Sequence, residues 1–156
     1  EKTFNANAGM FYDLQDVRGY DSIIPKQYAD FMGLIGEQSE LQYNRIAPIF
    51  ASGQGALDSP LLDMLNVKYV LTDRARAIDA PGYELVYDEE IRIYRNNQAL
   101  PRAFLVPQAL SIPDQVQRAE ALRTFDPRQV VLLEETVERP LGPPAADFSS
   151  DIEAID

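Results

Sequence analysis

The spacing of apolar residues predicts a helix in the N-terminal third of the chain. Apolar side chains recur there at intervals of three and four residues, at Tyr28, Phe31, Met32 and Ile35. This is the spacing of one face of an α-helix. Pro25 suits the first helical position, because proline lacks only an N–H group that has no partner at a helix start. The pattern therefore predicts a helix over residues 25–37.

The middle of the chain predicts a short helix that leads into a strand. Asp58 or Ser59 can cap the helix, Pro60 suits its first turn, and Asn66 is a typical terminating residue. Residues 67–72 are rich in β-branched and aromatic side chains, which favour a strand.

The second half of the chain alternates between strand-like and helical patterns. Residues 83–87 and 91–95 are joined by a short acidic turn and predict a β-hairpin. A third apolar run of strand length occupies 103–106, and the apolar spacing of 113–125 predicts a helix. Residues 129–133 predict a last strand, which would lie parallel to 103–106 if the helix crosses over between them.

These elements together predict a domain in the α/β to α+β range. We expect a mixed β-sheet of about four or five strands, with about three helices packed on it. Residues 1–139 would form one soluble domain, and 140–156 a proline-rich and then acidic C-terminal tail. Residues 38–57 read as a short strand or irregular segment leading into a loop, and Met10, Phe11 and Tyr12 as either a short strand or a docked loop.

Composition supports a soluble, globular domain. The chain has 156 residues, of which 46% are hydrophobic and 25% charged, close to the average for folded soluble domains. It has no run of about 18 apolar residues that would span a bilayer. It begins at Glu1 in a polar run, and we expect it to be a piece of a longer protein.

Charge and missing residue types narrow the function classes. Twenty-five acidic and fourteen basic side chains give a net charge of −11, which would repel the phosphates of a nucleic acid. The chain has no histidine and no cysteine. A Ser-His-Asp triad, a thiolate nucleophile and a zinc site with histidine or sulfur ligands are therefore excluded for this chain alone. We expect no catalytic residue, no metal and no cofactor, and we expect the acidic tail to be solvated rather than to bind calcium.

A dense group of charged and aromatic residues precedes the first predicted helix, and it fits two interpretations. In one, Asp16, Arg18 and Asp21 bind a sugar hydroxyl or phosphate, while Tyr12 or Tyr20 stacks on a sugar ring. In the other, Arg18 makes a bidentate ion pair with a nearby carboxylate and fixes its own loop. Of the two, the ion pair is the interpretation that we favour.

Two further cations lie beside predicted strands. Arg102 follows Pro101 and precedes the apolar run at 103–106, so it suits an ion pair or an anion contact. Lys68 lies between apolar neighbours, and on an alternating strand we expect it to point to solvent while Val67 and Tyr69 pack inward.

Three phrases of the sequence resemble one family. They are Asp16-Val-Arg-Gly-Tyr-Asp21 with Pro25 and Tyr28, Leu61-Leu-Asp-Met-Leu-Asn-Val-Lys-Tyr-Val-Leu-Thr72, and Arg92-Ile-Tyr-Arg-Asn96 leading to Ala99-Leu-Pro-Arg-Ala-Phe-Leu-Val106. Their order and approximate spacing resemble the extracytoplasmic region of YfhO-like bacterial membrane proteins. The resemblance covers residues 16–106, with weaker support to 133.

The resemblance implies a function for the chain within a larger parent. The family looks like multi-spanning, GT-C-type glycosyltransferases that use polyprenyl-phosphate-linked sugars in the cell envelope. The chain would then be a non-catalytic accessory domain on the extracytoplasmic face of the membrane. Its partners would be the rest of the parent chain and a lipid-linked sugar or envelope polysaccharide. The alternative is a glycan- or protein-binding module of the envelope with no enzymatic parent.

Overall fold

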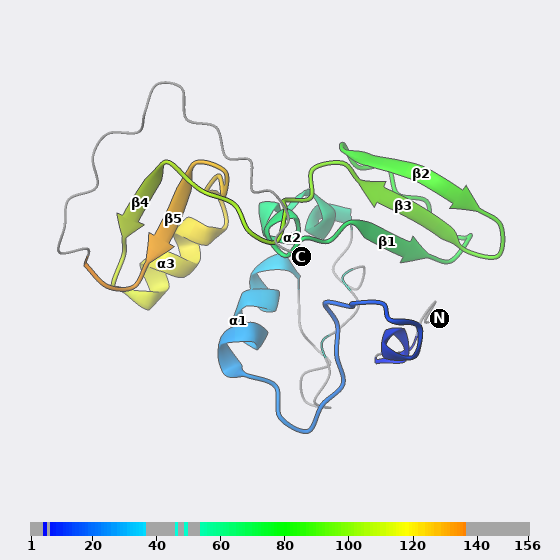
Figure 1. Cartoon of the computed structure of the whole chain (residues 1–156), viewed down its shortest axis with the longest axis horizontal. Coiled ribbons are helices and arrows are strands. Elements are labelled where there is room, and N and C mark those ends of the chain that lie inside the picture. The colour runs from blue at the N-terminus through cyan, green and yellow to red at the C-terminus, as the bar shows by residue number, and fades with distance from the viewer. Residues whose placement is uncertain (1–4, 6, 37–45, 47–48, 50–53, 137–156) are drawn as a thin grey trace.

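The computed structural model describes residues 5, 7–36, 46, 49 and 54–136 (Figure 1). The tail at 140–156 and most of the segment at 38–57 lie outside these residues. The α-helices are α1 (Lys26–Ile35), α2 (Pro60–Met64) and α3 (Gln115–Leu122). The strands are β1 (Tyr69–Thr72), β2 (Tyr83–Asp88), β3 (Arg92–Asn96), β4 (Gln108–Ser111) and β5 (Val130–Leu133), and two 3-10 helices are η1 (Ala8–Tyr12) and η4 (Gln54–Asp58).

The strands divide between two sheets. A three-stranded antiparallel sheet has the order β1-β3-β2, and β4 pairs with β5 in a two-stranded parallel sheet. The predicted mixed class, with five strands and three α-helices, is confirmed. The β2–β3 hairpin and the helical crossover between β4 and β5 are also confirmed. A tight turn joins β2 to β3 and a helix joins the parallel strands β4 and β5, whereas β1 pairs with β3 although β2 lies between them in the sequence.

The predicted strand at 103–106 is wrong. These residues are irregular, and β4 begins only at Gln108, directly after Pro107. Proline has no N–H group and restricts the residue before it, so it fits the start of a strand better than its interior. The parallel partner of β5 is therefore the segment after Pro107.

The first turns of the chain also differ from expectation. Met10, Phe11 and Tyr12 belong to η1, which is neither a strand nor a docked loop, and their side chains are exposed. Tyr69 was expected to pack inward but is 55% exposed. It lies on the face of β1 opposite Val70, whose side chain packs against the core. Lys68 is exposed, as predicted.

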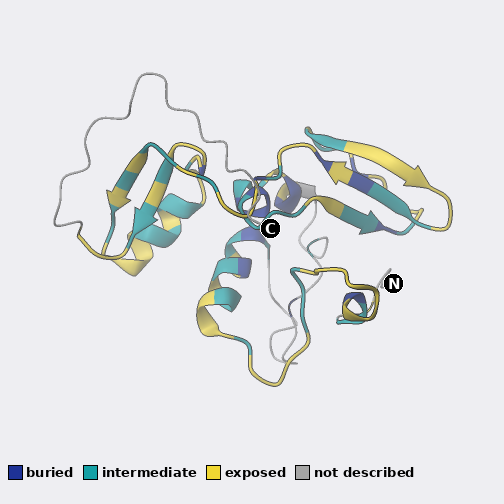
Figure 2. Ribbon diagram, in the orientation of Figure 1, coloured by how far each residue is buried: buried dark blue, intermediate teal, exposed yellow. Residues whose placement is uncertain are grey.

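The core lies where α1, α2 and β3 meet (Figure 2). Met32 of α1 and Leu61 and Leu62 of α2 are fully buried, and Tyr94 of β3 closes the cluster. The predicted α1 periodicity is confirmed, because its four apolar residues all belong to the core or pack against it. The helix itself begins one residue after Pro25, which takes the capping position.

Local signals at α2 behave as the sequence indicates. The Ser59 hydroxyl accepts a hydrogen bond from the Leu61 N–H (3.3 Å), and Pro60 is the first helical residue. Asn66 ends this region with a φ of 57°, a left-handed conformation that asparagine tolerates better than most residues. The Asn66 side chain also donates to the Leu100 carbonyl at 2.5 Å, which ties the end of this region to the segment after β3.

A buried polar pair ties α2 to β3. The side-chain amide of Asn96 donates to Asp63 Oδ1 (2.8 Å) and to the Val67 carbonyl (3.1 Å). Its oxygen accepts from the Gln98 N–H at 2.9 Å. Both side chains are buried, with Asn96 5% and Asp63 8% exposed. Because buried polar groups are costly when unpaired, this pair fixes the position of α2 against the sheet.

We expect stability to fall between pH 10 and pH 12 through Tyr83. Burial, followed by the negative charges of Asp63 and Asp58, raises the pKa of Tyr83 from 10.0 to about 12. The folded state therefore holds this proton more tightly than the unfolded state. The contribution of this raised pKa to the free energy of unfolding is complete below pH 10 and is lost as the pH rises through 12.

Urea unfolding of the wild type and Tyr83→Phe at pH 9, 10 and 11 tests this contribution. The variant loses the hydroxyl donor to the Leu57 carbonyl (3.2 Å), at a cost of about 1 kcal/mol at neutral pH. Its stability should then decline less steeply above pH 10 than that of the wild type. Parallel pH profiles for the two proteins would contradict the assignment.

Candidate functional site

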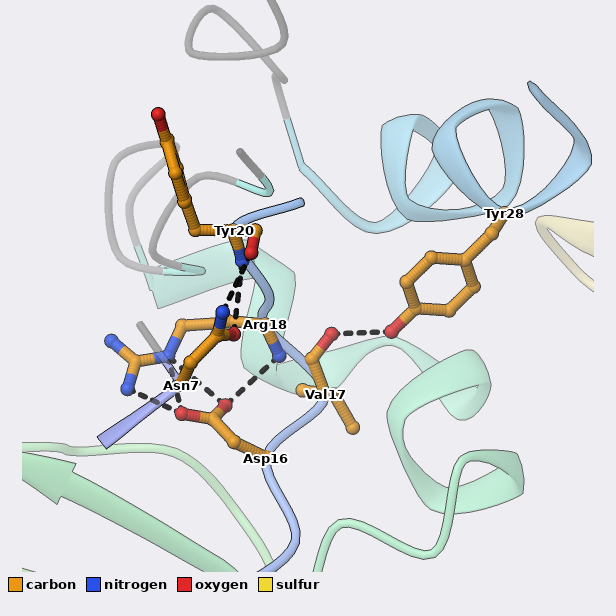
Figure 3. A network of polar contacts seen from close by, with 6 residues as sticks. All are labelled: Asn7, Asp16, Val17, Arg18, Tyr20 and Tyr28. Carbon is orange, nitrogen blue, oxygen red and sulfur yellow. Dashed lines mark hydrogen bonds and ion pairs between the residues drawn. The ribbon is translucent and has the colours of Figure 1, made fainter. Parts of the chain in front are cut away.

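The N-terminal segment forms a closed loop held by one asparagine. The Asn7 side-chain amide donates to the Tyr20 carbonyl (2.6 Å), and its oxygen accepts from the Tyr20 N–H (3.0 Å). Asn7 thus bonds to both backbone groups of Tyr20, as a neighbouring strand would (Figure 3). Asn7 itself has a φ of 66°, a value that asparagine adopts more readily than most residues.

Arg18 makes a bidentate ion pair inside this loop. Its Nη2 lies 2.6 Å from Asp16 Oδ2, and its Nε lies 3.1 Å from Oδ1 (Figure 3). The backbone N–H of Arg18 also donates to Asp16 Oδ1 at 2.9 Å. Both side chains are about one-fifth exposed. This geometry agrees with the interpretation in which Arg18 fixes its own loop. Both carboxylate oxygens of Asp16 accept hydrogen bonds from Arg18.

The loop is anchored to α1 and to the chain beyond it. The Tyr28 hydroxyl of α1 donates to the Val17 carbonyl (Figure 3), and the Ile46 N–H donates to the Gly19 carbonyl at 3.0 Å. Burial, followed by the charge of Asp16, raises the pKa of Tyr28, so its phenol stays protonated as a donor. These bonds hold the loop as one wall of a cleft.

A cleft of about 980 Å³ lies between this loop and the three-stranded sheet. The loop side includes Leu14, Asp16 and Arg18, and the sheet side is largely apolar. The sheet residues that line it are Tyr69, Val70 and Leu71 of β1, Val86 of β2 and Ile93 of β3. Lys68 and Arg102 also line the cleft. A mostly apolar surface with a few polar groups is the usual character of a ligand pocket.

The cleft brings together half of the candidate site residues. Asp16, Arg18 and Arg102 line it, although Arg102 is far from the other two in the sequence. The other three candidates are not among its lining residues. Tyr12 is 71% and Tyr20 58% exposed, and Asp21 Oδ1 accepts from the Ile23 N–H (3.2 Å) within its own turn.

Sequence reasoning did not select two lining residues, Lys68 and Tyr69, as site candidates. The sequence places both of them at the start of a strand, and residue alternation alone does not say which face of that strand is covered. Asn66 was the available signal for these residues. A turn at Asn66 sets the direction of β1 relative to α2, and so decides which side chains of β1 face the cleft.

The cleft is equipped for binding rather than for proton transfer. Asp13 and Asp16 are its only lining carboxylates among the described residues, and Asp16 is held by Arg18. Glycoside hydrolysis by two carboxylates needs one on each side of the bond that is cleaved, and both of these come from the same loop. Within the part of the chain that the structure describes, no acidic residues group as a metal site would require.

Replacing Arg18 with alanine should lower the free energy of unfolding by about 1.5 kcal/mol, because a bidentate, charge-assisted and partly buried pair is lost. Thermal and urea unfolding measure this change. Arg95→Ala is a matched control, since Arg95 pairs with Glu84 at the same 2.6 Å but with both side chains about half exposed. The control should cost less than about 1 kcal/mol. Equal losses for the two variants would argue against a loop-fixing role for Arg18.

Comparisons with protein-family models, curated proteins and solved structures found no match for this chain. The YfhO-like resemblance therefore stays a prediction from the sequence. In the described residues, no helix is both long enough and apolar enough to cross a membrane.

Proposed function

We propose that this chain is a non-catalytic binding domain of the bacterial cell envelope, the extracytoplasmic accessory domain of a YfhO-like, glycosyltransferase-like membrane protein. In this role it holds the saccharide part of a lipid-linked sugar or an envelope polysaccharide for the parent chain. Chemistry, if the parent carries it out, belongs to residues outside this chain.

The observation that carries the proposal is the cleft beside β1. Its wall of Tyr69, Leu71 and Ile93 offers an aromatic and apolar surface, and charged groups stand beside it. Tyr69 remains 55% exposed and available for a sugar ring. Pockets of this size and mixed character bind small molecules through apolar contact, with polar groups that set the orientation. The missing histidine and the occupied Asp16 favour binding over catalysis.

Titration of the whole chain, followed by amide NMR shifts, tests the proposal. The probes are a short N-acetylglucosamine oligosaccharide and a short-chain polyprenyl-phosphate-linked glucose. Shifts should gather at Leu71, Ile93 and Arg102 and be absent from α3. Absence of any shift with both saccharides, or shifts confined to α3, would refute saccharide binding in the cleft.

Tyr69→Ala gives the matched variant. It should weaken saccharide binding by about fivefold, the size of one aromatic contact. Tyr87→Ala removes another exposed tyrosine of the same sheet that does not line the cleft, and it should bind as the wild type does. The proposal does not survive if both variants bind equally well.

A second candidate function is protein binding by the N-terminal loop. Large apolar side chains of this loop that do not line the cleft are exposed, at Met10, Phe11, Tyr12, Tyr20 and Ile23, and each is more than half exposed. Exposed apolar side chains that form one patch are typical of interaction sites. Phe11→Ser would then abolish binding of this chain to the rest of the parent protein, supplied as a separate polypeptide, while saccharide titrations stay unchanged. The reverse result would favour the cleft alone.

A further inference from the structure

Most of the basic side chains that the structure describes are paired, and those that are not lie at the cleft. Eight of the described Lys and Arg side chains form ion pairs with a carboxylate. Arg128 instead donates to the Gln98 carbonyl at 2.6 Å. Among the residues that the structure describes, this leaves two cations without an ion pair or a side-chain hydrogen bond, Lys68 and Arg102, and both line the cleft.

Hydrogen bonds connect the segments of the chain that carry these two cations. Asn66 donates to the Leu100 carbonyl at 2.5 Å, and the Asn96 N–H donates to the Lys68 carbonyl at 2.8 Å. Asn66 lies two residues before Lys68 and Leu100 lies two residues before Arg102, so one side-chain hydrogen bond joins the segments that lead to the two cations. Lys68 precedes β1, and Arg102 follows two residues after Leu100. The places of Lys68 and Arg102 in the cleft are therefore set by the hydrogen bonds of their neighbours.

Charge in the cleft is opposite to that of the chain as a whole. Arg18, Lys68 and Arg102 line it against the carboxylates Asp13 and Asp16, which leaves an excess of one positive charge. The complete chain carries a net charge of −11. Because a cleft lined by positive charge raises the local concentration of anions, cations without an ion pair in a pocket of an acidic protein favour an anionic ligand.

We propose that Lys68 and Arg102 form an oxyanion site in the cleft and that the saccharide bound there is anionic, a sugar phosphate or a uronate. This inference rests on the proposed function, and it adds the charge of the ligand. The apolar wall at Leu71 and Ile93 contacts the sugar or its aglycone, while the two cations contact the phosphate or carboxylate oxygens. Arg102 offers a planar fork of donors for such an oxyanion, and Lys68 adds a point charge.

Calorimetric or NMR titration of the whole chain at low ionic strength tests the site. The probes are glucose, glucose 1-phosphate, glucuronate and inorganic phosphate. The wild type should bind the two anionic sugars more tightly than glucose, and added salt should weaken only the anionic ligands. Inorganic phosphate should compete with both anionic sugars. The preference between glucose 1-phosphate and glucuronate identifies the oxyanion.

Lys68→Gln and Arg102→Gln should each weaken binding of the anionic sugars by about fivefold, the effect of one charge near a solvated site. Their affinity for glucose should fall by less than their affinity for the anionic sugars. Arg123→Gln is the control, because it alters the net charge equally at an exposed ion pair outside the cleft.

The outcomes separate the two proposals. Equal affinity for glucose and for the anionic sugars, or Lys68→Gln and Arg102→Gln variants that match Arg123→Gln, would overturn the oxyanion site while leaving saccharide binding in place. Failure of every sugar to bind the wild type would overturn the proposed function and the oxyanion site together. Selective weakening of the anionic sugars in both cleft variants would support the site.

Discussion

Replacing Asn96 with alanine is expected to lower the free energy of unfolding by about 3 kcal/mol. The variant removes both donors and the acceptor of a side chain that is 5% exposed. Asp63 then keeps a buried carboxylate without its 2.8 Å donor, and the Gln98 N–H loses its acceptor. Leaving buried polar groups unpaired costs more than the lost hydrogen bonds contribute.

Urea unfolding with far-UV circular dichroism measures this loss. Asn97→Ala is the adjacent control, because Asn97 is exposed and its side chain, among the described residues, bonds only to exposed Arg95 and Glu84. The control should change stability by less than about 0.5 kcal/mol. A double-mutant cycle with Asp63→Ala should be non-additive, since the two side chains share one bond. Additive losses would show that Asn96 and Asp63 act separately.

Leu62→Ala is expected to cost about 3 kcal/mol, and to lower the melting temperature accordingly. Leu62 is 0% exposed and lies in the cluster formed by α1, α2 and β3. Removing its isobutyl group takes away buried apolar contact and leaves a cavity that the surrounding helices close only in part.

The matched control for Leu62 is the same substitution at an exposed leucine. Leu105→Ala lies in the irregular segment before β4 and is 59% exposed. It should cost less than about 1 kcal/mol, measured by the same thermal and urea unfolding. A similar loss at both positions would mean that α2 does not lie in the core.

Local sequence chemistry predicted the elements that depend on neighbours along the chain. The apolar spacing at Tyr28, Met32 and Ile35 gives α1, because helical periodicity is a property of consecutive residues. Ser59 and Pro60 begin α2, and Asn66 ends that region, for the same reason. The β2–β3 hairpin follows from two alternating runs and a short turn.

Features that depend on distant partners were predicted less well. The apolar run at 103–106 satisfies a strand composition, but Pro107 allows the strand to begin only at Gln108. The division into two sheets depends on which strands pair, and composition does not encode that choice. Tyr69 was placed on the wrong face because Val70, and not its neighbour, packs against the core.

The candidate site shows the same division. Arg18 and Asp16 are two residues apart, so their ion pair follows from local sequence. Arg102 joins them at the cleft only because Asn66 and Leu100 hold distant segments together. What marks Lys68 as a candidate is that the other cations have partners, and this pairing is a property of the folded chain.

The two walls of the cleft differ in how they are bonded, and this has a consequence for opening motions. One wall is closed by side-chain bonds at Asn7 and by the Ile46 N–H to Gly19, whereas the other is a strand ladder. Regions held by few hydrogen bonds exchange their amide protons through smaller openings than sheet interiors do. A ligand in the cleft should therefore slow deuterium uptake at the backbone amides of Tyr20 and Ile46 and leave the uptake of the β3 amides unchanged. These two amides would then report whether the cleft is occupied.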